Sequence, residues 1–136
     1  IWNHPYRSPL MAARVHHVPF RLDLARMRQA VKALVGKHDF RSFTSPSAIK
    51  KEKISYVRTV KQFRVKKEGY LIRIQVEADG FLYHMVRNMV GTLLEVGRGK
   101  RSPASIKTIL GAKDRRQAGM TAPSEGLTLI RVRYKP

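Results

Sequence analysis

The segment GFLYHMVRNMVGTLLEVGRGK, residues 80–100, is the most informative about the fold, because its apolar side chains recur at the spacing of an α-helix. The pattern predicts one long helix, and we expect the carboxylate of Asp79 to cap its N-terminus. The apolar positions cover about half of the helix circumference or more, which is typical of a helix packed into a core. They are Phe81, Leu82, Met85, Val86, Met89, Val90, Leu93 and Leu94.

Four other residues share the remaining strip of this predicted helix. His84, Arg87, Asn88 and Gly91 recur at spacings of three and four, so they fall on one side. A guanidinium among apolar neighbours needs a carboxylate or phosphate partner, because a buried unpaired charge is very costly. No acid within the segment is well placed to be that partner. Two interpretations stay open: a structural ion pair at the edge of the core, or an arginine with a functional role.

The flanking segments predict an α+β architecture, with an antiparallel sheet and helices packed on one face. Residues 56–65 alternate, with Val57, Phe63 and Val65 on one face, and residues 70–78 alternate more clearly after a turn at KKEG, 66–69. The buried face of the second strand is predicted to consist of Tyr70, Ile72, Ile74, Val76 and Ala78. LTLIRVRY, residues 127–134, predicts a last strand. Its expected core residues are Thr128, Ile130, Val132 and Tyr134.

Two further helices are predicted from their start and stop signals. Asp23 is the expected N-cap of a helix that ends before Gly36, and its apolar stripe includes Met27 and Val31. Ser102 followed by Pro103 predicts the start of a shorter helix that ends at Gly111. Residues 1–20, 37–53 and 112–126 have no sustained period, so we predict loops there, with a short extended piece at residues 13–18.

The charge balance narrows the class of partner. The chain has 28 Lys and Arg against 9 Asp and Glu, a formal net charge of +19. Such an excess favours a polyanionic partner, nucleic acid, over a generally cationic or membrane-surface protein. No stretch approaches the roughly 18 to 20 apolar residues of a membrane span. Without cysteines there are no thiolate ligands, and the adjacent His16 and His17 face opposite ways on a strand, so no metal site is predicted.

Basic residues cluster on both sides of the predicted short helix. GRGKR (97–101) and KDRR (113–116) would each be ordinary solvated helix ends, but with the arginines of the last strand they predict a track for phosphates. The predicted RNA-contacting residues are Arg58, Arg98, Lys100, Arg101, Arg115, Arg116, Arg131 and Arg133.

KHDFRSF (37–43), the helix segment and AKDRRQAGMTAPSEGLTLIRVRY (112–134) together resemble the C-terminal half of bacterial-type tRNA pseudouridine synthase A. The resemblance covers essentially the whole chain, so residues 1–136 are expected to form the C-terminal half of a pseudouridine synthase fold. It implies an isomerase that converts uridine to pseudouridine in the anticodon arm of tRNA, with no cofactor and no metal. It also implies a cytoplasmic homodimer that has no contact with a membrane.

The resemblance also assigns roles to single residues. Arg87 matches the family's active-site arginine, which pairs with the nucleophilic aspartate of a G-R-T-D motif, and Leu127 matches a leucine of the substrate pocket. His84 and Asn88 are expected to orient groups around Arg87 at the substrate. The chain contains no G-R-T-D and begins without Met. We therefore expect an N-terminal half with the nucleophile to be missing, and this polypeptide alone to have no turnover.

A second interpretation is a non-catalytic RNA-binding module, such as a ribosome-associated protein. The two interpretations differ in what replacing Arg87 does: turnover falls if the arginine supports catalysis, whereas affinity and its salt dependence fall together if it binds a phosphate. A purely structural arginine would mainly affect stability.

Overall fold

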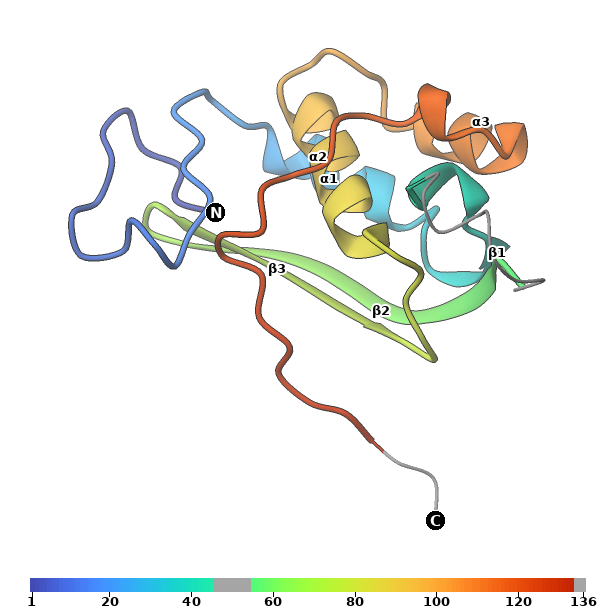
Figure 1. Ribbon diagram of the computed structural model, residues 1–136. Coiled ribbons are helices and arrows are strands. Elements are labelled where there is room, and N and C mark those ends of the chain that lie inside the picture. Colours follow the sequence, from blue (N-terminus) through green and yellow to red (C-terminus); the bar gives the residue numbers. More distant parts are fainter. Residues whose placement is uncertain (46–54, 134–136) are drawn as a thin grey trace.

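The computed structural model describes residues 1–45 and 55–133. Within these residues the helices are α1 (Leu24–Val31), α2 (Met85–Gly97) and α3 (Ser105–Ala112), and the strands are β1 (Gly36–Asp39), β2 (Val57–Glu68) and β3 (Leu71–Ala78). Short 3-10 turns are η1 (Arg41–Phe43) and η3 (Arg115–Gln117). Figure 1 shows the helices on one face of the sheet, which confirms the predicted α+β class. None of the described helices is long and apolar enough to cross a membrane.

The sheet is antiparallel, with the strand order β1-β2-β3. The predicted turn at residues 66–69 lies too early, because Lys66 pairs with Arg73 and Glu68 with Leu71. The chain reverses at Gly69, whose φ of 60° suits a tight hairpin turn. Tyr70, which was predicted on the buried face, is therefore 55% exposed beside that turn.

A β-bulge changes which residues of β2 face the helices. The register with β3 shifts between Val60 and Gln62. Phe63 and Val65 are buried as predicted, and Val60 joins them at 1% exposed. An extra residue in one strand moves the side chains that precede it to the opposite faces of the sheet. Val57 is consequently 38% exposed, and its prediction as a buried residue is wrong.

The core lies between the sheet and the helices. Helix α1 begins as predicted, since the Asp23 carboxylate accepts a hydrogen bond from the backbone N–H of Arg26 at 3.2 Å. Its buried residues are Met27, Ala30 and Val31. The largest fully buried side chains of the core are Phe40, Phe43, Met27, Leu34, Ile72, Met85, Met89, Leu93 and Ile106.

Helix α2 begins later than expected. Its first residue is Met85, and its N-cap is His84, which adopts a left-handed conformation with a φ of 58°. Asp79 does not cap it, because the Asp79 carboxylate accepts from the backbone N–H of Thr59 at 2.9 Å across the hairpin. The predicted cap is therefore wrong: a residue close in sequence to the helix is used by the sheet.

Two other boundaries also differ from the prediction. Helix α3 begins at Ser105, because Ser102 and Pro103 form a turn in which the Ser102 carbonyl accepts from the Ser105 backbone N–H at 3.1 Å. The predicted loop at residues 37–53 contains the end of β1 and all of η1, and its later part lies outside the described residues. Strand β1 has no apolar alternation, and its pairing with β2, as at Lys37 and Thr59, holds it in place.

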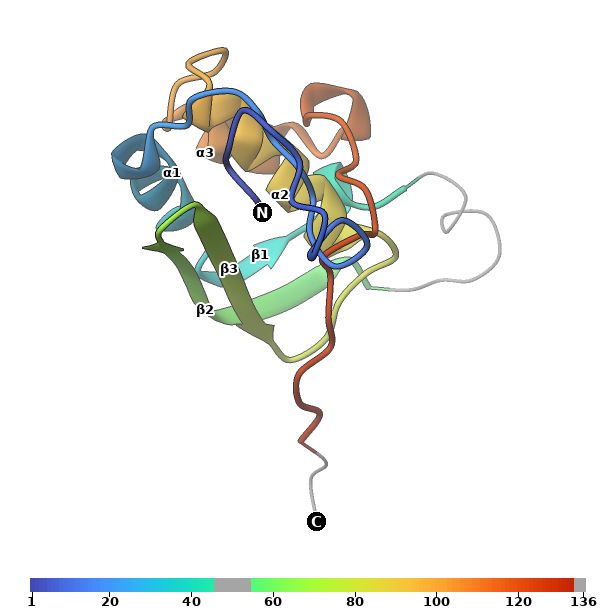
Figure 2. The same ribbon diagram turned by 90° about the vertical axis from the view of Figure 1, so that its left-hand side faces the viewer.

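Residues 127–133 form no strand. Figures 1 and 2 show this segment leaving the helices and the sheet. Thr128, Ile130 and Val132 are exposed, so the predicted last strand and its core residues are wrong, while Tyr134 lies outside the described residues. A strand needs a neighbour to take its backbone hydrogen bonds, and none of the described strands pairs with this segment.

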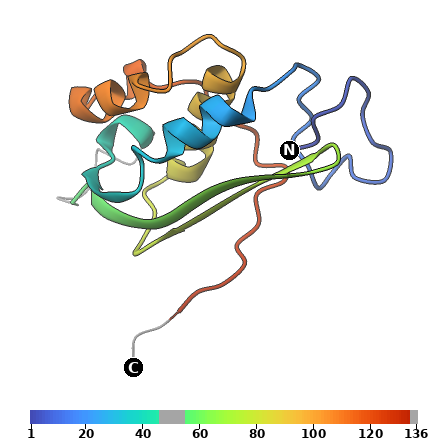
Figure 3. The ribbon, with the colours of Figure 1, turned by 180° about the vertical axis from the view of Figure 1, so that it is seen from behind.

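The N-terminal loop lies beside the turn end of the β2–β3 hairpin, as Figure 3 shows from behind. Trp2 forms isolated bridges with His17 and with Leu71. The extended piece predicted at residues 13–18 is thus limited to a single bridged pair.

Candidate active site

Arg87 lies in the first turn of α2 and is half-buried. Its Nε donates to the carbonyl oxygen of Ala122 at 2.7 Å, and the backbone N–H of Ala122 donates to the Arg87 carbonyl at 3.0 Å. The segment that follows η3 is therefore fastened to α2 by both the side chain and the backbone of Arg87.

Gly91 allows this segment to approach the helix. A Cβ at Gly91 would lie 1.6 Å from the Met120 carbonyl oxygen, a distance that no real contact reaches. The backbone of residues 120–122 thus packs directly on the helix one turn after Arg87. The group that packs against Gly91 on the polar strip is thus the chain's own backbone.

We expect Gly91→Ala to lower the free energy of unfolding by about 1–3 kcal/mol, because the added methyl group displaces the packed backbone. Gly111→Ala is the matched control, since Gly111 lies in α3 and a Cβ there meets nothing within 4 Å. That control is expected to gain up to about 1 kcal/mol from helix propensity. Urea unfolding of both variants measures the difference, and equal effects would show that the close approach at Gly91 is unimportant.

His84 holds the other side of the Arg87 guanidinium. Nη1 of Arg87 lies 3.3 Å from Nε2 of His84, and Nδ1 of His84 lies 3.0 Å from Oγ of Ser45. Because a guanidinium only donates, Nε2 must be the acceptor, and the ring proton is on Nδ1. Both contacts are satisfied together by the Nδ1–H tautomer of His84, which donates to Ser45.

Arg87 is not neutralised by any acid in the described part of the chain. None of the ion pairs within residues 1–45 and 55–133 includes it. A guanidinium has five N–H donors, and the Ala122 carbonyl and His84 take one each, so three have no acceptor within that part of the chain. Such a half-buried fork is suited to a carboxylate or a phosphate from outside these residues.

Arg87 and Leu127 line the same small pocket of about 80 Å³. A cavity needs only about 10–15 Å³ to hold one water, so this pocket has room for more than a single water. Its walls come from the N-terminal loop, β3, α2 and the segment after η3. The lining residues are Ile1, His16, Ile74, Val86, Arg87, Val90, Ala122, Pro123, Glu125, Gly126 and Leu127.

The turn at Gly126 brings Leu127 to this pocket. Gly126 has a φ of 88°, and a Cβ there would lie 3.0 Å from the backbone nitrogen of His16. Glycine is therefore required both by the turn and by the contact with the N-terminal loop. Leu127 follows at the rim with 52% of its surface exposed. Burial lowers the pKa of His16, and the nearby carboxylate of Glu125 acts in the opposite direction.

Asn88 lies away from the pocket and is completely buried. Its Nδ2 donates to the Phe43 carbonyl at 2.7 Å, and its Oδ1 accepts from Thr121 Oγ1 at 2.6 Å and from Arg115 Nη2 at 3.1 Å. The side chain thus joins α2 to η1 and to the segment after η3. Its predicted contact with the substrate stays a prediction.

Two of the predicted RNA-contacting arginines are used inside the fold. Arg115 donates to Asn88 and Thr121, and burial lowers its pKa. Arg101 pairs with Glu95 and donates from Nη1 to the Gln117 carbonyl at 2.8 Å. Both guanidinium groups hold the 113–121 segment against α2.

The other predicted contacts are nearer the solvent. Arg98 is exposed, and its guanidinium stacks 3.9 Å above the centre of the Phe20 ring. Arg116 pairs with Asp114 and thereby lowers the pKa of that carboxyl. Arg58 donates to the Ser55 and Val57 carbonyls. Lys100 is exposed, as are Arg131 and Arg133 on the irregular C-terminal segment.

Several residues around Arg87 were not predicted. Ser45 and the Ala122 carbonyl orient the arginine and its histidine, but neither has a signal in the sequence, because both contacts join segments distant along the chain. Glu125 and Gly126 lie in SEGL, residues 124–127, which is part of the stretch that carries the family resemblance and was therefore a usable signal. Within the described residues no group of three His, Asp or Glu side chains is placed to hold a metal.

The fold and the site thus define a strongly basic α+β domain in which a half-buried arginine, with donors left unused by the described residues, lines a small pocket. The sequence profile described as tRNA pseudouridine synthase matches residues 30–135. The chain therefore belongs to the tRNA pseudouridine synthase family.

Its relatives carry the same description. It is 47% identical to tRNA pseudouridine synthase A 2 of Clostridium perfringens over 120 residues. The matched stretch covers 88% of this chain and 48% of the relative. It is 49% identical over 117 residues to tRNA pseudouridine synthase A of Geobacillus kaustophilus, covering 86% and 44%. The Brevibacillus brevis protein of that name is 46% identical over 132 residues, covering 97% and 53%. The chain spans about half the length of these relatives.

Proposed function

We propose that this chain is the C-terminal half of a tRNA pseudouridine synthase and supplies the supporting side of its active site. The nucleophilic aspartate comes from a preceding segment. Its carboxylate attacks the uridine and bonds to it, the glycosidic C–N bond breaks, and the uracil reattaches through carbon as the carboxylate is released. The proton lost from that carbon passes to the freed ring nitrogen, so no atom is gained or lost. The substrate is the anticodon arm of tRNA.

The observation that carries this proposal is the state of Arg87. A half-buried guanidinium that is anchored at Ala122 and His84, with three N–H groups unused in the described part of the chain, is preorganised for an anion. A carboxylate held by it stays ionised, because a neighbouring positive charge lowers the pKa of an acid. The aspartate is thereby kept anionic and fixed in direction, as a nucleophile requires.

The pocket supports the same proposal. Leu127, Val86 and Val90 give it apolar walls beside the guanidinium. A nucleotide flipped out of the stack is commonly received between such walls. Leu127 then contacts the flipped base, and His84 acts through Arg87 rather than on the substrate directly.

The alternative of a non-catalytic RNA-binding module is not favoured, because the matching relatives are named as synthases. We further propose that the complete protein is a cytoplasmic homodimer, as the resemblance implies. Light scattering on the purified full-length protein measures the number of subunits.

A fusion experiment tests the missing nucleophile. In this fusion, the N-terminal part of the Brevibacillus brevis relative is joined ahead of Ile1. The fusion protein is expected to convert uridine to pseudouridine in unmodified tRNA. The chain alone is expected to give no product, because it lacks the attacking carboxylate.

The rejoined halves of the Brevibacillus brevis protein serve as the positive control, and thermal unfolding establishes that each fusion is folded. Product from the chain alone would contradict the assignment of the nucleophile to another segment. A folded fusion that binds tRNA without forming product would favour the binding-module alternative.

A further inference from the structure

Tyr83 is an exposed aromatic side chain in a rigid setting. It precedes α2 and has 52% of its surface exposed. Its carbonyl oxygen accepts from Thr44 Oγ1 at 3.0 Å and from the backbone N–H of Ser45 at 3.4 Å. The backbone that carries this ring is therefore fixed to the segment after η1, although the ring itself lies at the surface.

One face of the Tyr83 ring is covered by His84. The two ring centres lie 3.8 Å apart with an angle of 21° between the planes, which is a stacked pair. His84 adopts a φ of 58°, a conformation that only one other non-glycine residue among the described ones adopts. Strained backbone of this kind persists when surrounding contacts hold it, and it concentrates at functional sites. Half of the Tyr83 surface is open, and among the described residues no ring other than His84 stacks on it, so its second face is the one that a ligand would meet.

The stack is connected to the pocket. The His84 ring that supports Tyr83 also accepts the hydrogen bond from Nη1 of Arg87 at 3.3 Å. Tyr83, His84 and Arg87 thus form a continuous row from the surface to the arginine of the candidate active site. A planar group on the open face of Tyr83 is separated from Arg87 by the two rings.

We propose that Tyr83 is a stacking platform for an unpaired RNA base next to the uridine that enters the pocket. This rests on the proposed function, because it takes the pocket to be the uridine site. Aromatic rings with one supported and one open face are the usual means by which proteins hold single-stranded bases. The chain has a net charge of +19, which favours a polyanionic nucleic acid as the ligand over a protein surface with few acidic residues.

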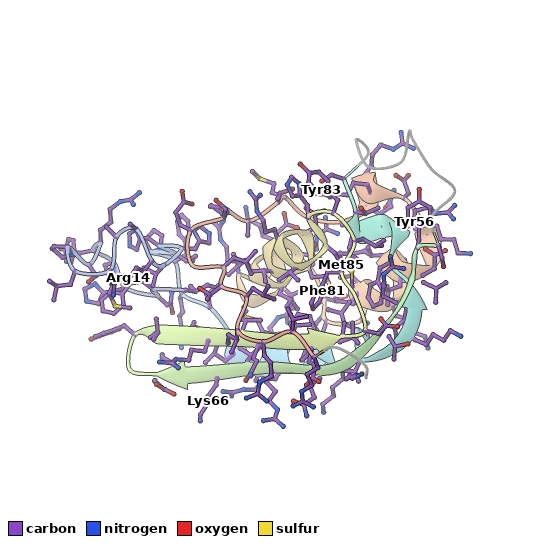
Figure 4. All side chains as sticks on the ribbon, turned by 60° about the horizontal axis from the view of Figure 1, so that its bottom comes forward. Arg14, Tyr56, Lys66, Phe81, Tyr83 and Met85 are labelled. Carbon is purple, nitrogen blue, oxygen red and sulfur yellow. The ribbon has the colours of Figure 1, made fainter. Side chains whose placement is uncertain are left out.

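Figure 4 shows that Tyr83 and Tyr56 lie toward one end of the molecule, away from Arg14 and from Lys66 near the hairpin turn. Tyr70, in that turn, provides a matched control because its exposure of 55% is close to that of Tyr83. Its ring is met edge-on by His4, at 87° between the planes, instead of being stacked on a supporting ring.

The test measures tRNA binding by the full-length protein with Tyr83→Leu, Tyr83→Phe and Tyr70→Leu. We expect Tyr83→Leu to raise the Kd about ten-fold, the Phe variant to bind like the parent, and Tyr70→Leu to change Kd less than about two-fold. The salt dependence of Kd stays constant, since no phosphate contact is lost. In tRNA carrying 5-iodouridine beside the target, we expect ultraviolet cross-linking to Tyr83.

An unchanged Kd for Tyr83→Leu, or an equal loss for Tyr70→Leu, would overturn the platform. A cross-link that maps elsewhere while the parent binds normally would overturn it as well. Pseudouridine formation by the parent protein is scored separately. If the parent protein forms pseudouridine but the Tyr83 tests fail, only the stacking proposal is wrong. If the parent protein forms no pseudouridine, the proposed function is wrong.

Discussion

Replacing Arg87 with alanine in the full-length protein is expected to lower kcat about a hundred- to a thousand-fold, with little change in the Kd for tRNA. A preorganised cation that stabilises charge in a water-poor site contributes about this much to a rate. The guanidinium is half-buried and has no acidic partner within residues 1–45 and 55–133, so its role in the proposed enzyme is to hold the nucleophile. Single-turnover pseudouridine formation measures the chemical step.

Arg87→Lys is the conservative control, because it keeps the charge but loses the planar fork that binds Ala122 and a carboxylate together. We expect an intermediate rate from it. Unfolding of both variants must be followed as well, since the Ala122 carbonyl loses its donor. A parallel fall in tRNA affinity and in its salt dependence would instead identify Arg87 as a phosphate contact.

Replacing Asn88 with leucine is expected to lower the free energy of unfolding by about 2–4 kcal/mol. The substitution is close in size, but it leaves the Phe43 carbonyl, Thr121 and Arg115 without the partners they have in a buried site. A buried polar group without a hydrogen bond costs about 1–3 kcal/mol. Urea unfolding measures the loss.

Gln75→Leu is the matched control because it makes the same amide-to-leucine change at an exposed position of β3, where we expect less than about 0.5 kcal/mol. A double-mutant cycle with Arg115→Ala tests whether the two residues act as one network. An unchanged stability together with a raised KM would show that Asn88 serves the RNA rather than the fold.

The local features of this protein could be predicted from its amino-acid sequence. Helix α1 with its Asp23 cap and the β2–β3 hairpin follow from periodicity and capping chemistry, which depend on residues close together along the chain. The sequence of α2 and its flanking segments was enough to indicate the family. The apolar pattern of α2 also indicated that Arg87 is a cation that needs a partner.

Features that depend on contacts between distant segments became visible only in the folded chain. The Asp79 carboxylate accepts a hydrogen bond from the Thr59 backbone N–H and does not cap α2. Residues 127–133 form no strand, because no described strand takes their backbone hydrogen bonds. The contacts of Arg87 also depend on distant segments, since the Ala122 carbonyl that accepts its hydrogen bond is 35 residues away in the sequence. Periodicity records which face of an element is apolar, but which backbone group meets a side chain is set only when the segments pack together.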